Sequence, residues 1–267
     1  MARTPYVGGN WKMNTDRASA EALAAEVALG VVPGVEVAIF PPFPYLIPVG
    51  EAVLGADARA AAQREGARPL VKLGAQDCYF EKNGAFTGEV SPEMLSDCAV
   101  QSVLTGHSER RHVLGEPDEL VNRKTRAVLD AGLGCVLCIG ERLDERKTGQ
   151  TDAVNERQLR AGLSGVAPEQ MSRVVVAYEP VWAIGTGVVA TPADAQDAHA
   201  NIRALLADLY SPAIAASTRI IYGGSLKPSN AAEILAQPDV DGGLVGGASL
   251  KAADFLAIVQ AAARRHR

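Results

Sequence analysis

Eight short apolar runs, spaced along the chain at fairly regular intervals, constrain the fold more than any other feature of the sequence. Their starts lie 22 to 44 residues apart, which leaves room for a helix between most consecutive runs. This spacing predicts parallel strands joined by crossover helices rather than antiparallel hairpins. The expected strands are residues 6–7, 35–40, 70–73, 100–104, 135–139, 174–178, 218–222 and 240–245.

The segments between these runs carry helix signals. Ser91 and Thr191 each precede a proline, and a hydroxyl followed by proline at the first helical position is typical of a helix start. Gly132 provides a stop for the helix expected before it. Residues 252–267 place apolar side chains on one face and basic ones in the final turn, which indicates a last, amphipathic helix.

Eight strands that alternate with helices predict an α/β fold, namely a closed (β/α)8 barrel of parallel strands with outer helices, as one domain over residues 1–267. An open doubly wound sheet is the alternative, but its usual G-x-G-x-x-G fingerprint is missing after the first strand. The Ala- and Arg-rich residues 55–69 are expected to form a solvated helix extension or loop, away from the chemistry.

Charge and composition exclude several classes of protein. Lys and Arg total 26 and Asp and Glu total 31, so the net charge is −5, and no basic tract indicates binding to nucleic acid or an anionic membrane. The first ten residues lack an apolar signal region, and the apolar runs are shorter than a membrane span. We therefore expect a cytoplasmic protein that acts on small molecules.

The four cysteines are expected to be reduced thiols, because they are too few to cross-link a chain of this length. Cys135 and Cys138 have the spacing of half a zinc site, but no second pair is present. Residues three apart in a strand point to opposite faces, so buried thiols are the preferred interpretation.

Glycines follow the last two expected strands, in Gly223-Gly224-Ser225 and Gly246-Gly247, and a further glycine loop contains Gly185 and Gly187. Backbone N–H groups at such glycines can approach an anion closely, and loops at these positions in barrels commonly bind phosphate. Tight turns would be the preferred explanation for any single pair. Three glycine loops at strand ends favour a phosphate site.

Three titratable side chains also follow expected strands. Glu179 follows a very apolar run, so we expect a partly dry carboxylate of raised basicity, although a helix cap or a salt bridge is the usual role of a lone glutamate. His107 falls where a helix is expected to begin, which favours a neutral imidazole, but a structural loop histidine fits the sequence equally well. Lys12 follows the first expected strand and is either a solvated surface charge or a cation beside His107 and Glu179. Together these groups suit proton abstraction next to a carbonyl, with stabilisation of an enediolate.

Ordered motifs along nearly the whole chain resemble the triosephosphate isomerase family. They are GNWK at 9–12, GAQ at 74–76, AFTGE at 85–89, TGHSER at 105–110, CIGE at 138–141, AYEPVWAIGTG at 177–187, YGGS at 222–225 and LVGG at 244–247. The resemblance implies an isomerase of glycolysis and gluconeogenesis that interconverts dihydroxyacetone phosphate and D-glyceraldehyde 3-phosphate. It also implies that the reaction needs no cofactor and no metal.

The resemblance further implies roles for individual residues. Glu179 resembles the base that moves a proton between two carbons, and His107 resembles the electrophile that moves protons on the oxygens. Lys12 resembles the cation that stabilises negative charge, Asn10 the group that orients the substrate oxygens, and Glu109 the supporting carboxylate near Lys12. The implied phosphate contacts are Gly185, Ser225, Gly246 and Gly247, under a lid formed by residues 180–187.

Members of this family usually form homodimers, so the resemblance implies a homodimer here. The loop at residues 84–89 is expected to insert into the neighbouring subunit. Thr87 would then reach towards that subunit's Asn10 and Glu109 region.

Three features depart from the family pattern. Asp77 stands where asparagine is more common, which is expected to remove the amide donor of an interface hydrogen bond and to affect subunit affinity. Val188-Val189 places stiff β-branched residues at the far lid hinge, where a polar pair is common, so lid kinetics are expected to differ. Residues 55–69 resemble an insertion that should not touch catalysis, because it precedes the third strand.

Two rival functions share part of this chemistry. A Schiff-base aldolase barrel with Lys12 as nucleophile also needs phosphate binding and proton transfer, but it would form a covalent adduct that borohydride traps. A non-catalytic phosphate-binding barrel would need no general base. The joint presence of Lys12, His107 and Glu179 weighs against that second alternative.

Overall fold

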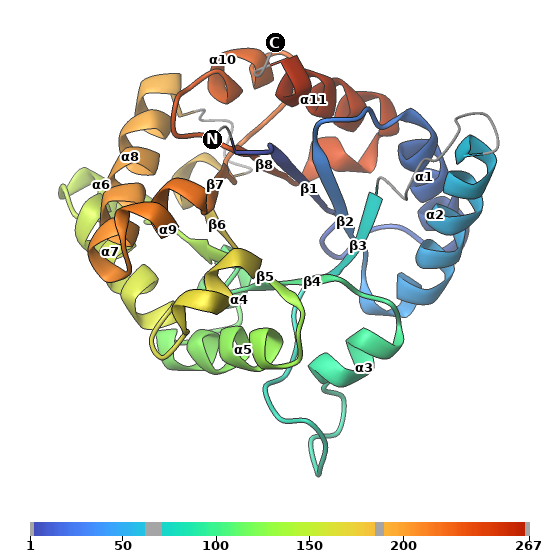
Figure 1. The fold of residues 1–267 in the computed structure, drawn as a ribbon, viewed down its shortest axis with the longest axis horizontal. Coiled ribbons are helices and arrows are strands. Elements are labelled where there is room, and N and C mark those ends of the chain that lie inside the picture. The colour runs from blue at the N-terminus through green and yellow to red at the C-terminus, as the bar shows by residue number, and fades with distance from the viewer. Residues whose placement is uncertain (1–2, 62–70, 185–189, 265–267) are drawn as a thin grey trace.

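A computed structural model describes residues 3–61, 71–184 and 190–264 of the chain. Eight parallel strands form a closed barrel in the order β1 to β8, and helices surround it (Figure 1). The (β/α)8 barrel predicted from the strand spacing is therefore confirmed. The strands are β1 (Tyr6–Asn10), β2 (Glu36–Phe40), β3 (Val71–Ala75), β4 (Ser102–Thr105), β5 (Gly134–Ile139), β6 (Val174–Tyr178), β7 (Arg219–Tyr222) and β8 (Gly242–Val245).

Alternation along the strands builds two cores. Each strand pairs in parallel with the next, and β1 closes the barrel against β8, where Tyr6 lies opposite Gly242. Side chains that point inward fill the barrel, while those that point outward pack against the helices. The inward set comprises Tyr6, Ala38, Phe40, Leu104, Val136, Cys138, Val175, Ala177, Ile221 and Leu244.

Strand β1 is longer than the sequence predicts. The expected strand ends at residue 7 because Gly8 and Gly9 are typical of a turn, yet both glycines lie inside β1. A Cβ atom at Gly8 would lie 3.1 Å from side-chain atoms of Phe40 and Leu244, and one at Gly9 would lie 3.2 Å from the Phe255 ring. These glycines allow close packing on both faces of the strand.

The helices begin and end largely where the sequence indicates. Ser91 accepts a hydrogen bond from the Met94 N–H at 3.3 Å, and Thr191 accepts one from the Asp194 N–H at 3.1 Å, so both predicted caps are confirmed. Gly132 adopts a left-handed φ of 82° just after a helix, as a C-terminal stop requires. The helices are α1 (Arg17–Gly30), α2 (Leu46–Ala61), α3 (Pro92–Asp97), α4 (Ser108–His112), α5 (Asp118–Asp130), α6 (Leu143–Lys147), α7 (Thr151–Gly162), α8 (Pro192–Leu209), α9 (Pro212–Ser217), α10 (Ala231–Leu235) and α11 (Ala252–Arg264).

The segment expected to be solvated, residues 55–69, is only partly described. Its first seven residues continue α2, so the helix extension is confirmed, but Ala56 and Asp57 are buried. The expectation of a fully solvated segment is therefore wrong for this part, because α2 packs beside α1 on the outside of the barrel (Figure 1). Residues 62–69 lie outside the described part of the chain.

The two neighbouring cysteines of β5 are buried on opposite faces of the strand. Cys135 belongs to the core between strands and helices, whereas Cys138 belongs to the barrel interior. The prediction of buried strand thiols is confirmed, and this geometry prevents the two sulfurs from binding one metal ion.

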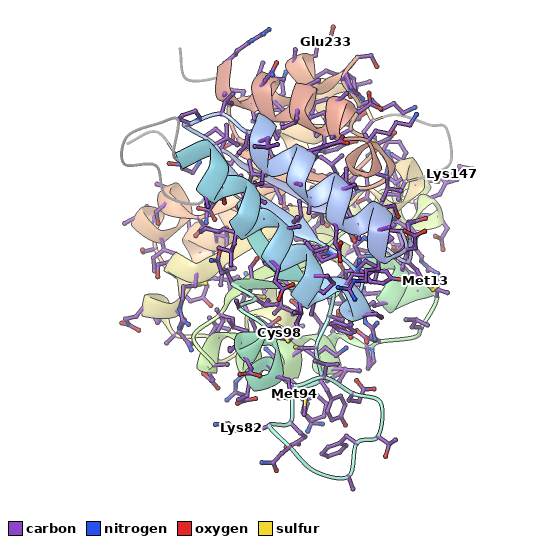
Figure 2. The ribbon with its side chains drawn as sticks, turned by 90° about the vertical axis from the view of Figure 1, so that its right-hand side faces the viewer. Met13, Lys82, Met94, Cys98, Lys147 and Glu233 are labelled. Atoms are coloured by element: carbon purple, nitrogen blue, oxygen red, sulfur yellow. The ribbon has the colours of Figure 1, made fainter. Side chains whose placement is uncertain are left out.

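A loop between β3 and α3 projects from the barrel, and Figure 2 shows Lys82 on it. Residues 82–89 of this loop are exposed, including Thr87. None of the helices within the described residues is long and apolar enough to cross a membrane.

Candidate active site

A cavity of about 710 Å³ opens at the carboxyl ends of the strands, where a parallel barrel gathers its loops. It collects segments that are far apart in the sequence, since its walls follow β1, β4, β6, β7 and β8. Gly185 lies outside the described residues. The predicted site residues that the cavity does bring together are Asn10, Lys12, His107, Glu179, Ser225, Gly246 and Gly247.

Lys12 is held in an unusual backbone conformation. Its φ is 52°, in the left-handed region that side chains other than glycine rarely adopt. The Lys12 N–H donates to Asn10 Oδ1 at 2.9 Å, and the Gln76 amide donates to the Lys12 carbonyl at 2.7 Å. Lys12 Nζ lies 2.6 Å from Glu109 Oε1, which confirms the expected proximity of Glu109. Strain that is held by contacts on both sides is typical of functional positions.

Sequence reasoning assigned no role to Gln76, although it placed this residue at a strand end. The Gln76 amide also donates to the carbonyl of Phe40 at 2.8 Å, so it fixes the Lys12 backbone to the end of β2. Its position in the GAQ motif, directly after β3, was the sequence signal that could have indicated a role for Gln76. Gln76 therefore holds the strained lysine in place.

His107 caps the N-terminus of α4, as the sequence predicts. Its Nδ1 accepts a hydrogen bond from the Glu109 N–H at 3.3 Å, and its Nε2 lies 3.0 Å from Glu179 Oε1. A ring that accepts at Nδ1 and donates at Nε2 is neutral. Burial lowers the pKa of His107, but the adjacent Glu179 carboxylate raises it above the ordinary histidine value. The sequence predicts that the helix N-terminus lowers the pKa of His107, but the Glu179 carboxylate outweighs this effect.

Glu179 is buried, with 2% of its surface exposed, as its apolar strand predicts. Its Oε2 accepts a hydrogen bond from the Ser108 N–H at 2.8 Å. Burial raises the pKa of Glu179, but the His107 and Ser108 contacts outweigh burial and hold that pKa below its ordinary value. The predicted raised basicity of Glu179 is therefore wrong for this arrangement. The donors that lower its pKa lie at the start of α4, some 70 residues earlier in the chain, so the strand sequence around Glu179 gives no sign of them.

Glu141 anchors the first half of the segment predicted to be the lid. Its fully buried carboxylate accepts hydrogen bonds from the Tyr178 hydroxyl at 3.1 Å and from Trp182 Nε1 at 2.8 Å. Trp182 belongs to a short 3-10 helix, η3 (Val181–Ala183). The hinge pair Val188-Val189 lies outside the described residues.

The glycine loops after β7 and β8 line the cavity, as predicted. Gly246 lies against Lys12, since a Cβ atom at Gly246 would be 3.4 Å from Lys12 Cε. A Cβ atom at Gly247 would meet no heavy atom within 4 Å, so the backbone there borders open space. A cavity lined by glycine loops and a lysine is suited to an anion.

Asp77 is buried in a cluster of charges that includes residues of α4 and α5. Its carboxylate lies 2.8 Å from Lys124 Nζ and 2.9 Å from the Arg110 guanidinium, and Glu116 Oε1 lies 2.6 Å from both cations. Burial raises the pKa of Asp77 to about 6, although the two cations oppose that rise. The side chain thus makes ion pairs within its own chain, whereas the sequence predicts an effect at the subunit interface.

Replacing Asp77 with asparagine is expected to stabilise the protein at pH 7.5. The folded pKa of about 6 lies above the unfolded value of about 3.9, so the folded state of the wild type loses stability as pH rises from 4 to 6. A pKa difference of two units between the folded and unfolded states changes the free energy of unfolding by at most about 3 kcal/mol. Urea unfolding should show Asp77→Asn more stable by about 1–3 kcal/mol at pH 7.5, with a smaller difference at pH 4.5.

Glu116 remains paired with Lys124 in this variant, so the buried ammonium keeps a partner. The matched control is Asp208→Asn, because Asp208 is exposed beside Arg160. A variant that is less stable than the wild type at pH 7.5 would show that the ion pairs of Asp77 outweigh its burial.

Comparison with known proteins covers the whole barrel. A family model described as triosephosphate isomerase matches residues 5–262. The triosephosphate isomerases of Carboxydothermus hydrogenoformans and Chloroflexus aurantiacus are 50% and 51% identical to the chain, over 97% and 96% of its length and 98% of theirs. The triosephosphate isomerase of Symbiobacterium thermophilum is 49% identical over 98% of both chains.

Proposed function

The chain belongs to the triosephosphate isomerase family and interconverts dihydroxyacetone phosphate and D-glyceraldehyde 3-phosphate, and we propose that Glu179, His107 and Lys12 carry this reaction. The observation that carries the assignment is the 3.0 Å contact between His107 Nε2 and the buried Glu179 carboxylate, in the same cavity as Lys12. Isomerisation needs a base at carbon and a donor at the carbonyl oxygen, and these groups supply both.

Glu179 removes the proton from the carbon next to the carbonyl and returns it to the neighbouring carbon. His107 donates through Nε2 to the oxygen on which negative charge develops, and the Lys12 ammonium stabilises that charge. Asn10 orients the substrate oxygens, and Glu109 positions Lys12 through the 2.6 Å ion pair. The enediolate is protonated on the opposite carbon to complete the exchange.

Substrate binding changes the protonation balance of this site. A substrate placed between base and electrophile separates Glu179 from His107, so the carboxylate loses the largest of the contacts that lower its pKa. Burial then dominates, and the pKa of Glu179 rises towards the range suited to a general base. The same separation removes the carboxylate that raises the pKa of His107, which keeps the imidazole neutral.

The phosphate group is bound by the loops after β7 and β8, through Ser225, Gly246 and Gly247. The family resemblance assigns Gly185, which lies outside the described residues, to the same phosphate site. The contacts of Glu141 with Trp182 support a lid that turns about a fixed first half. Closure of such a lid excludes water, which protects the enediolate from phosphate elimination.

Lys12→Met tests the role of the ammonium. Loss of the cation that stabilises developing charge is expected to lower kcat/KM for D-glyceraldehyde 3-phosphate by at least about 100-fold. A coupled spectrophotometric assay measures this, beside circular dichroism to confirm folding. Borohydride treatment of wild type with substrate should give no adduct, whereas a trapped adduct on Lys12 would support the aldolase alternative.

We also propose a homodimer in which each chain works in the cytoplasm, with the projecting loop of one subunit covering the site of the other. Phe86 on that loop and Met13 near Lys12 both expose apolar side chains, as an interface that excludes water requires. Thr87 lies on the exposed part of the same loop. Its partners in the neighbouring subunit are the surroundings of Asn10 and Glu109.

Sedimentation at micromolar concentration should show the wild type at twice the mass of one 27.9 kDa chain. Thr87→Arg places a charge in the interface and is expected to give a monomer with activity reduced at least about tenfold. Ser217→Arg, on an exposed position at the end of α9, is the control and should remain dimeric. A fully active wild-type monomer would contradict the dimer.

A further inference from the structure

A second cavity lies at the opposite end of the barrel, at the amino ends of the strands. It has a volume of about 210 Å³, and its described lining shares no residue with the active-site cavity. Glu36 and Arg219 line it because each stands two positions before an inward-facing residue of its strand, Ala38 and Ile221 respectively. The barrel interior is therefore polar at this end, although its middle layer is apolar.

The lining of this cavity carries an excess of positive charge. Among the described residues that line it, Lys72, Arg173 and Arg219 are cations and Glu36 is the carboxylate, so the net charge is +2. Glu36 accepts from Lys72 at 2.9 Å and from Arg219 at 2.8 Å, and these two cations hold the pKa of its partly buried carboxyl below the ordinary value. Arg173 donates to the Leu129 carbonyl at 2.8 Å.

Two buried hydroxyls in this cavity lack hydrogen-bond partners within the described chain. They belong to Tyr6 and Ser102, which are 2% and 8% exposed. Ser102 lies beside Tyr6, and the interaction between their side chains opposes the rise that burial causes in the tyrosine pKa, but its geometry is not that of a complete hydrogen bond. A buried hydroxyl without a partner is unfavourable, so a group that accepts hydrogen bonds from both would be bound favourably.

The lining is thus rich in donors and poor in free acceptors. The hydroxyls of Tyr6, Ser102 and Ser172 border it, together with two guanidinium groups, one ammonium and the Gln101 amide. Its carboxylate already accepts from two cations. A ligand that matches this surface must accept hydrogen bonds and carry negative charge. The volume suffices for a group of this kind, because a single water accounts for about 30 Å³.

We propose that this cavity binds a small oxyanion, inorganic phosphate, through Tyr6, Ser102 and the surrounding cations. Lys72 is partly exposed, so the anion enters from the solvent at this end of the barrel. The ligand contacts strands β1 and β4 through the hydroxyls and β3 and β7 through the cations. It therefore stabilises the folded barrel without competing for the active site.

Variants that each weaken one of the two sites distinguish phosphate binding in this cavity from phosphate binding in the active site. Isothermal titration with inorganic phosphate should show two sites per chain in the wild type. The double variant Tyr6→Phe with Ser102→Ala keeps the shape of the cavity and removes both donors, and is expected to weaken the second site at least about tenfold. Lys12→Met should weaken the other site and leave this one intact.

The same variants give an independent readout in selenate-soaked crystals, because selenium scatters anomalously. An anomalous peak beside Tyr6 and Ser102 in the wild type, absent from the double variant, is the expected result. Kinetic constants of the double variant should equal those of the wild type, which shows that it folds. One phosphate site per chain in solution, unaffected by the double variant, would overturn the proposal, even if selenate binds at crystal concentration.

Discussion

Replacing Glu179 with glutamine is expected to lower kcat by about 10² to 10⁴, because the variant keeps the shape of the side chain but loses the group that accepts the proton from carbon. The amide can still accept a hydrogen bond from the Ser108 N–H, which the carboxylate accepts at 2.8 Å, so the local structure should be retained. Steady-state kinetics in both directions measure the effect. KM should change far less than kcat, because Glu179 acts on the reacting proton rather than on the phosphate.

Glu179→Asp provides the matched comparison, since it keeps the base but moves it by one methylene group. It should retain more activity than Glu179→Gln while remaining slower than the wild type. Equal activity of Glu179→Gln and wild type would contradict the assignment of the base.

The second large effect is expected from Gly140→Ala. Gly140 stands directly after β5, and a Cβ atom there would lie 1.7 Å from the carbonyl oxygen of Glu179. That neighbour is backbone, which cannot rotate away, so β5 and the start of the lid segment must separate. We expect a loss of stability of about 3 kcal/mol or more, together with a fall in kcat of at least about tenfold as Glu179 is displaced.

Gly55→Ala is the control for this substitution. A Cβ atom at Gly55 would meet no heavy atom within 4 Å, and this residue lies inside helix α2. Alanine is favoured over glycine in a helix by about 0.5–1 kcal/mol, so this variant should be slightly more stable than the wild type. Chemical unfolding and kinetics of both variants provide the test. A Gly140→Ala enzyme with wild-type stability and activity would contradict the close approach of β5 and β6.

The barrel was predictable because its signals are local and repeated. Apolar runs at crossover spacing give the eight strands, and hydroxyl–proline pairs at Ser91 and Thr191 give two helix starts. The end of β1 was missed because glycine signals a turn locally, whereas Gly8 and Gly9 serve packing against β8 and α11, more than 230 residues away.

The positions of the site residues were predictable for a different reason. Parallel strands bring their carboxyl ends to one mouth, so Lys12, His107 and Glu179 had to converge if the strands were correctly identified. Their electrostatics were not predictable, because the pKa of Glu179 depends on donors of α4 whose distances no spacing reveals. The ion pairs of Asp77 and the hydroxyls of Tyr6 and Ser102 likewise appear only when distant strands and helices are packed together.

Proton NMR of the isomerisation in D2O tests the central claim most directly, namely that this chain moves a proton between two carbons through Glu179. Wild-type enzyme with D-glyceraldehyde 3-phosphate should yield dihydroxyacetone phosphate that carries deuterium at the exchanged carbon, because an enediolate intermediate allows solvent exchange. Glu179→Gln should lose both conversion and deuterium incorporation. No conversion by folded wild-type protein, or unchanged deuterium incorporation by Glu179→Gln, would contradict the account.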